Sequence, residues 1–214
     1  MRGREAQGEA ILPHQKIQGL LRRGGHQAQS KSRIHKSGIR GLSLEMRTYK
    51  IVVTGPFNAG KTTLIRTLCG KILESDRRLL VETVKQTTTV ALDFGLLEVD
   101  DKRVRLFGTP GQRRFFFMWR VLAKGMDGYI LMVDSQDPKS LVDAAFIYDY
   151  FRRNFPDKPH VIAANKADGG NIIPEKVMRH ALKASLEIPV IPTIALDRES
   201  AMNLLRFLLG MIKP

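Results

Sequence analysis

The sequence has little of several features that define whole classes of protein. Its 214 residues contain one cysteine, Cys69, which excludes an intrachain disulfide framework and favours a reducing compartment. No apolar run reaches the roughly 18–20 residues of a membrane span, and the first ten residues lack the apolar core of a signal peptide. We therefore expect a cytoplasmic protein without a transmembrane segment.

Positive charge is abundant and unevenly distributed. The chain carries 35 Lys and Arg against 21 Asp and Glu, and nine of these basic residues but only three acidic ones fall within residues 1–45. This segment shows no sustained apolar periodicity, so we expect a disordered basic extension there. It is either translated upstream sequence, since Met46 begins a typical domain start, or a tail that makes weak membrane-surface contact. Residues 46–214 are expected to fold.

From Tyr49 onward, short apolar stretches alternate with helical patterns. Strands are expected over 49–54, 91–99, 103–107, 128–134, 160–164 and 189–195, and helices over 61–72, 138–154, 174–185 and 198–211. The segments 91–99 and 103–107 resemble a hairpin across Asp100 and Asp101. The fold class is therefore α/β: a three-layer α/β/α sandwich with a mostly parallel six-stranded sheet and one antiparallel edge strand.

A phosphate-binding motif, GPFNAGKT, follows the first expected strand and precedes a helix. Its glycines allow backbone N–H groups to surround a phosphate, and the helix N-terminus adds a favourable dipole. Lys61 would reach the β- and γ-phosphates, and the Thr62 hydroxyl would bind Mg²⁺. The predicted phosphate-binding set is Gly55, Asn58, Ala59, Gly60, Lys61, Thr62 and Thr63. This motif does not distinguish ATP from GTP.

A second motif, NKAD, ends the strand expected at 160–164. The Asp168 carboxylate can accept two hydrogen bonds from the N1–H and N2 amino group of guanine, a pair that adenine does not offer. Asn165 would tether this loop to the phosphate loop, and the stem of Lys166 would cover the base. A later strand ends in TIAL, where Ala195 would direct its backbone N–H toward the base oxygen, with Leu196 beside it.

The ordered motifs GPFNAGKT, TTT, TPGQ and NKAD resemble those of the Ras-like small GTPases over roughly residues 47–212. The sequence looks most similar to prokaryotic members, including bacterial polarity GTPases of the MglA type and related bacterial and archaeal GTP-binding proteins. The resemblance implies a P-loop NTPase fold and binding of GTP or GDP with Mg²⁺. It also implies GTP hydrolysis as a molecular switch.

The resemblance also assigns two switch segments. Thr89 matches the threonine that binds Mg²⁺ and senses the γ-phosphate, with Thr88 as the alternative. Gly111 matches a glycine that contacts the γ-phosphate, and Gln112 the glutamine that orients the attacking water. Gly108 stands where these proteins commonly have an aspartate that holds a Mg²⁺-bound water. MglA-type proteins also carry a small residue there, and Asp93 or, with less support, Asp134 is a substitute acceptor.

Small GTPases are slow without an arginine at the transition state. The candidates are Arg77 and Arg78 in the first switch region and Arg113 and Arg114 beside Gln112. We select Arg78, with Gln112 and Lys61, as the catalytic set, although all four arginines are also compatible with solvated surface charges.

Five large apolar residues, FFFMW, follow the second switch. Successive helical residues point about 100° apart, so one core cannot bury all five at once. Either some face outward and bind a partner, or they pack beneath the switch. The resemblance suggests an effector and a regulator, either a GTPase-activating protein or a roadblock-type protein. We expect a monomer or weak dimer.

Three other functions compete with a GTPase switch. Gly108 favours a guanine-nucleotide-binding module with negligible hydrolysis. The basic tail suggests nucleic acid, but no aromatic interleaving or recognised motif supports that function. An ATPase is disfavoured by Asp168.

Overall fold

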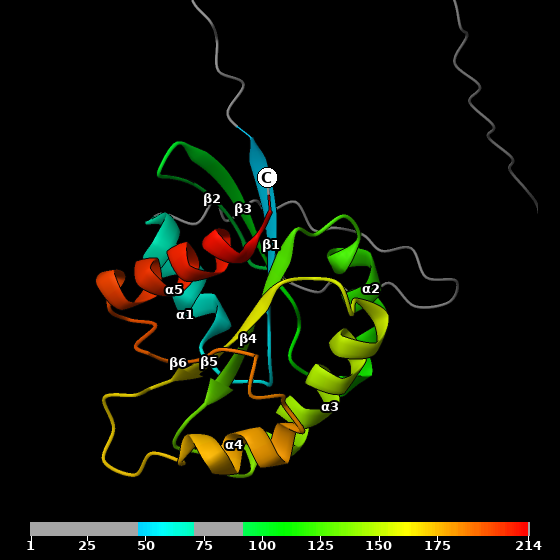
Figure 1. The fold of residues 1–214 in the computed structure, drawn as a ribbon, viewed down its shortest axis with the longest axis vertical. Coiled ribbons are helices and arrows are strands. Elements are labelled where there is room, and N and C mark those ends of the chain that lie inside the picture. Colours follow the sequence, from blue (N-terminus) through cyan, green and yellow to red (C-terminus); the bar gives the residue numbers. More distant parts are fainter. Residues whose placement is uncertain (1–46, 71–91, 214) are drawn as a thin grey trace, which may run out of the picture. The chain divides into compact units, whose positions relative to one another are not determined.

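The computed structural model describes residues 47–70 and 92–213 (Figure 1). The extension expected over residues 1–45 lies outside the described residues. The strands are β1 (Thr48–Thr54), β2 (Phe94–Val99), β3 (Lys102–Gly108), β4 (Gly128–Asp134), β5 (His160–Asn165) and β6 (Val190–Thr193). The helices are α1 (Lys61–Cys69), α2 (Phe116–Ala123), α3 (Ser140–Asn154), α4 (Glu175–Leu182) and α5 (Arg198–Met211), with a short 3₁₀ helix over Arg113–Phe115.

The strands form one sheet in the order β2-β3-β1-β4-β5-β6. The β2–β3 pair is antiparallel, and the other neighbouring strands are parallel. Strand β1 lies between β3 on one side and β4 on the other, so the strand order reverses at β1. In open α/β sheets, ligands bind at the carboxyl ends of the strands where the order reverses. The fold-class prediction is confirmed.

Two hydrophobic cores cover the two faces of the sheet. Ile51 and Val53 of β1 belong to the core shared with α1 and α5, whereas Val52 belongs to the core shared with α2, α3 and α4. This separation follows from the two-residue side-chain period of a strand. Figure 1 shows α1 and α5 on one side of the sheet and α2 and α3 on the other. The structure therefore has the predicted three layers.

Most elements lie where the sequence predicts them, and three of the helices, α1, α3 and α4, are shorter than predicted. Helix α1 ends at Cys69 rather than residue 72, because Gly70 takes a φ of 74° and donates its N–H to Arg66 O. Helix α4 ends at Leu182, where Lys183 adopts a left-handed φ of 53°. Asp100 and Asp101 both have positive φ, as expected for a tight hairpin between β2 and β3.

None of the helices within the described residues is long and apolar enough to cross a membrane.

Candidate functional site

The phosphate-binding motif forms a tight loop between β1 and α1. Gly60 has a φ of 97°, and a Cβ there would lie 2.2 Å from Asn165 Nδ2, so a side chain is excluded by both conformation and space. Ala59 is fully buried, and Asn58 adopts a left-handed φ of 63°. Helix α1 begins at Lys61, so its N-terminus opens directly onto the loop, as an anion site requires.

Lys61 is buried within this loop. Its Nζ donates to Pro56 O at 2.5 Å. Burial lowers the pKa of Lys61 to about 8, and the nearby Asp93 carboxylate opposes that shift. The ammonium group is partly desolvated and donates to one neutral acceptor, so a bound phosphate anion would stabilise its positive charge.

The hydroxyl of Thr62 reaches across to the beginning of β2. It donates to Asp93 Oδ2 at 2.5 Å. The N–H of Gly108 donates to the Asp93 backbone carbonyl at 2.8 Å. A Cβ at Gly108 would lie 2.9 Å from Asp93 Cβ and 3.1 Å from Ile65 Cδ1. The absence of a side chain at Gly108 thus makes room for the Asp93 carboxylate.

The second switch segment lies against the phosphate loop. A Cβ at Gly111 would be 2.5 Å from Phe57 N and 2.8 Å from Lys61 Nζ, so Gly111 is in close contact with the loop. Gln112 is exposed. The segment is held at its start, because Thr109 donates its hydroxyl to Thr54 Oγ1 at 2.8 Å.

One cavity of about 400 Å³ joins the phosphate loop, Asp93 and the second switch. Its lining includes most of the predicted phosphate and hydrolysis residues. These residues are Phe57, Asn58, Gly60, Lys61, Thr62, Thr63, Asp93, Gly108, Thr109, Pro110, Gly111, Gln112 and Phe115. The two sequence motifs therefore meet at one site.

Two oxygen donors in this cavity fit a hard divalent cation. Mg²⁺ typically takes one or two protein oxygens and completes its coordination with water and phosphate oxygens. The Thr62 hydroxyl and the Asp93 carboxylate supply such a pair. Within residues 47–70 and 92–213, no group of three or more His, Cys, Asp or Glu could hold a metal ion. Apart from this pair, the described residues would leave a metal at this cavity to take its further ligands from water and bound phosphate.

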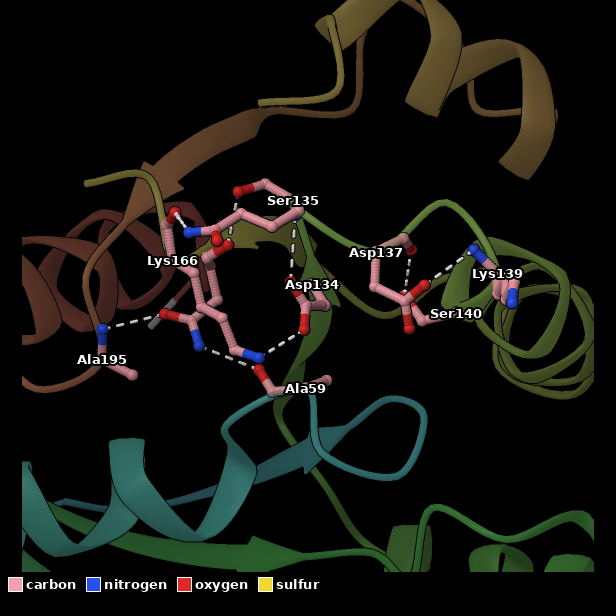
Figure 2. A network of polar contacts seen from close by, with 10 residues as sticks. Ala59, Asp134, Ser135, Asp137, Lys139, Ser140, Lys166 and Ala195 are labelled. Carbon is pink, nitrogen blue, oxygen red and sulfur yellow. Dashed lines mark hydrogen bonds and ion pairs between the residues drawn. The ribbon is translucent and has the colours of Figure 1, made fainter. Parts of the chain in front are cut away.

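The NKAD loop is fixed to the phosphate loop by Asn165. Its Nδ2 donates to Ala59 O at 2.9 Å, and its Oδ1 accepts from the Ala195 N–H at 2.8 Å (Figure 2). The first contact is the tether expected from the sequence. The second contact pairs the Ala195 N–H with the Asn165 side chain, and the role of Ala195 at the base oxygen stays a prediction. Leu196, the next residue, is 80% exposed.

Asp168 and Lys166 differ in how they are held. Asp168 is exposed beyond the end of β5, where its carboxylate is accessible. Lys166 adopts a left-handed φ of 63° and forms an ion pair with the buried Asp134. Asp134 is therefore committed to Lys166, and it does not take the role of the missing acidic residue at position 108. The two side chains meet because the parallel register of β4 and β5 sets Asp134 opposite Asn165, the residue before Lys166.

Several predicted residues lie elsewhere or outside the described chain. Arg77, Arg78, Thr87, Thr88 and Thr89 are all outside the described residues. Arg113 pairs with Asp143 at 2.7 Å and lies over the Phe146 ring, and Arg114 lies over the Phe115 ring. Both arginines thus contact surface groups, in agreement with the solvated alternative.

The aromatic run divides between the core and the surface. Met118 and Trp119 are buried, whereas Phe116 and Phe117 are 53% and 39% exposed. Some of these side chains therefore face outward, as the first of the two alternatives requires. The Trp119 indole donates to Pro110 O at 2.9 Å, a contact that the sequence analysis missed and that joins α2 to the second switch.

Comparison with known proteins gives related sequences. A family model described as "Conserved hypothetical ATP binding protein" matches residues 75–188, just over half of the chain. This match begins after the phosphate loop and includes the NKAD loop. The protein named "Uncharacterized protein MJ1339" from Methanocaldococcus jannaschii is 33% identical over 123 residues, 58% of this chain and 73% of that protein.

Two further relatives are more distant in sequence. Mutual gliding-motility protein MglA of Myxococcus xanthus is 28% identical over 146 residues, 62% of this chain and 74% of that protein. Human ADP-ribosylation factor-related protein 1 is 26% identical over 134 residues, 62% of this chain and 66% of that protein. Together with the phosphate loop and the mostly parallel sheet, these relatives indicate that the chain is a nucleotide-binding protein. The chain therefore belongs to the family described as conserved hypothetical ATP binding protein and is a P-loop relative of the small GTPases.

Proposed function

We propose that the chain binds GTP and GDP with Mg²⁺ and hydrolyses GTP, acting as a molecular switch. The observation that carries this proposal is the Asn165 bridge, which ties the NKAD loop to the phosphate loop at Ala59. The bridge holds the loop that carries Asp168 to the phosphate loop, and the proposal assigns the exposed Asp168 carboxylate to the base. A carboxylate there accepts from both donors on the guanine edge and is left unsatisfied by adenine.

The phosphate end of the site supports the same activity. Lys61 would contact the β- and γ-phosphates, Gly111 the γ-phosphate, and Gln112 the attacking water. Thr62 and Asp93 would hold Mg²⁺, whose charge would offset that of the phosphates. The predicted roles of Thr89 as a metal ligand and Arg78 at the transition state belong to this proposal as well.

The wider role follows from the same relationship. The chain would be a cytoplasmic monomer or weak dimer, similar to prokaryotic small GTPases of the MglA type. The exposed Phe116 and Phe117 beside the second switch offer a contact surface for an effector. A GTPase-activating protein or a roadblock-type protein would act at the same switches.

The decisive experiment measures bound nucleotide and its turnover. The purified full chain is denatured and its released nucleotide identified, and phosphate release from GTP and from ATP is then followed with Mg²⁺. We expect guanine nucleotide and phosphate release from GTP alone. Turnover should fall in Gln112→Ala, and guanine preference should be lost in Asp168→Ala but kept in Asp157→Ala, which changes an exposed carboxylate elsewhere.

Other outcomes would favour other functions. Retained guanine nucleotide without phosphate release would indicate a binding module. Equal competition by ATP would overturn the role given to Asp168 and agree with the description of the matched family.

A further inference from the structure

The last residue of β4 and the two residues after it contact the loop after β5. They are Asp134, Ser135 and Gln136, and none belongs to either nucleotide motif. Strands β4 and β5 are parallel neighbours whose register sets Asp134 opposite Asn165. Figure 2 shows the Asp134 and Lys166 side chains pointing toward each other, with Ser135 above them.

Asp134 uses both carboxylate oxygens at this place. Oδ2 pairs with Lys166 Nζ, and Oδ1 accepts from the Gln136 N–H at 3.0 Å. The Asp134 side chain is 7% exposed, whereas that of Lys166 is 35% exposed. A buried carboxylate thus fixes the end of a half-exposed lysine. The aliphatic stem of Lys166 is thereby held in one position beside the Asn165 bridge.

Ser135 and Gln136 hold the backbone of the same loop. Ser135 donates both its hydroxyl and its N–H to Asn165 O, at 2.6 and 2.9 Å. Gln136 Nε2 donates to Lys166 O at 2.7 Å. The left-handed backbone of Lys166 is unfavourable for a residue with a side chain, so it persists only where surrounding contacts impose it. These three hydrogen bonds are such contacts.

Gly169 reveals how closely Gln136 covers the loop. A Cβ at Gly169 would lie 1.9 Å from Gln136 Nε2 and 2.3 Å from Gln136 Cδ. The obstructing atoms are the end of a flexible side chain, and Gly169 is not among the glycines with positive φ. An alanine at this position would therefore displace the Gln136 amide and leave the backbone conformation allowed.

We propose that Asp134, Ser135 and Gln136 form a brace that positions Lys166 and Asp168 for the purine base and so sets the nucleotide release rate. This inference rests on the proposed binding of guanine nucleotide. The brace contacts the loop at Asn165 O, Lys166 O and Lys166 Nζ, whereas the bridge to Ala59 is made by the Asn165 side chain. It would act on the base end of the ligand and leave the phosphate cradle unchanged.

The first experiment measures release of a fluorescent GDP analogue from the full chain. Asp134→Asn removes the charge that holds Lys166, and we expect release about tenfold faster. The control is Asp137→Asn, because Asp137 accepts from the Lys139 N–H and belongs to the turn before α3. In a Lys166→Met background, Asp134→Asn should add nothing, since its partner is already absent.

The second experiment tests the brace with a change outside it. Gly169→Ala should displace the Gln136 amide and speed release about fivefold, matching Gln136→Ala, and the double variant should release no faster than either single one. Gly170→Ala is the matched control, because a Cβ at Gly170 meets nothing within 4 Å. Affinity for inorganic pyrophosphate, which lacks a base, should remain that of wild type in every variant.

These outcomes separate the brace from the proposed function. If wild type retains guanine nucleotide but neither Asp134→Asn nor Gly169→Ala speeds release, the brace is overturned alone. Additive effects in the double variants, or a parallel loss of pyrophosphate affinity, would overturn it too, because they indicate general loosening. If wild type retains no guanine nucleotide, the proposed function fails first and the brace fails with it.

Discussion

The Thr62 hydroxyl donates to Asp93 Oδ2 at 2.5 Å and joins the phosphate loop to the first residues before β2. The two residues are 31 positions apart in the chain. Their contact gives the cavity a carboxylate although its second switch has Gly108 where related proteins commonly have aspartate. The carboxylate of the cavity therefore comes from the residue before β2 and not from the end of β3.

Asp93→Asn should weaken Mg²⁺-dependent nucleotide binding. The amide keeps the size of the side chain but loses the negative charge, and we expect Mg²⁺ affinity to fall about tenfold to hundredfold. This affinity is obtained by measuring the rate of GDP release at increasing Mg²⁺ concentrations. Asp101→Asn serves as control, because Asp101 lies in the β2–β3 hairpin and asparagine also tolerates its left-handed φ of 62°. An unchanged Mg²⁺ titration in Asp93→Asn would exclude Asp93 from the metal site.

Restoring an aspartate at position 108 should destabilise the protein. The new Cβ would lie 2.9 Å from Asp93 Cβ, and overpacking of this kind costs about 2 kcal/mol in the free energy of unfolding. Urea unfolding of Gly108→Asp measures this loss. The double variant Asp93→Gly, Gly108→Asp removes the obstructing Cβ and should recover both stability and Mg²⁺ affinity. A stable Gly108→Asp single variant would contradict the steric relationship.

Nucleotide affinity should fall as the pH rises above about 8. Burial holds the pKa of Lys61 near 8 without a ligand, and bound phosphates would raise that pKa. Binding then takes up a proton above that pH, and affinity falls by up to about tenfold per pH unit. Calorimetry of GDP binding in buffers of different ionisation enthalpy measures the number of protons taken up on binding.

Lys61→Arg is the matched control for this pH dependence. Its guanidinium stays charged throughout this range, so its affinity should be weaker but independent of pH. A flat profile in wild type would mean that Lys61 is already fully protonated without nucleotide.

Acid should destabilise the fold through His160. Its Nδ1 lies 3.0 Å from Lys158 O and must donate, so Nε2 accepts from the Tyr148 hydroxyl at 3.1 Å. This arrangement needs the neutral ring, and burial lowers the pKa of His160 below its ordinary value of 6.5. The unfolded chain therefore binds the proton first, so stability is full above about pH 6.5 and declines as the pH falls below it.

Urea unfolding at about pH 7.5 and about pH 5.5 tests this dependence. Between these two pH values, the free energy of unfolding of wild type should fall by about 1 kcal/mol more than that of His160→Gln. His180→Gln, on the exposed surface of α4, should behave as wild type. Equal losses in wild type and His160→Gln would show that another group carries the acid sensitivity.

Local patterns predicted the order and type of the elements well. Helix α5 has the expected bounds, and Asp197 caps its start by accepting from the Ser200 N–H at 2.8 Å. Strand β4 is buried along its whole length, as its continuous apolar run predicts. The same local reasoning recognised the phosphate loop and the NKAD loop, since both follow buried strands.

Contacts between distant segments were less predictable. The tether from Asn165 to the phosphate loop was expected from the NKAD motif, but the Asp134–Lys166 pair was not. That pair depends on the register of β4 against β5, which no single-strand pattern reveals. The contact between the Ala195 N–H and Asn165 was also not expected, because the two residues are 30 positions apart in the chain.

The intrinsic fluorescence of Trp119 can report on the second switch. It is the only tryptophan in the chain, it is fully buried, and its indole N–H is bonded to the carbonyl of Pro110, two residues before Gln112. Indole emission responds to the polarity and hydrogen bonding of its surroundings. Any rearrangement that draws Pro110 away from α2 would therefore alter the intrinsic emission of the unlabelled protein, so Trp119 is a natural fluorescence probe for this segment.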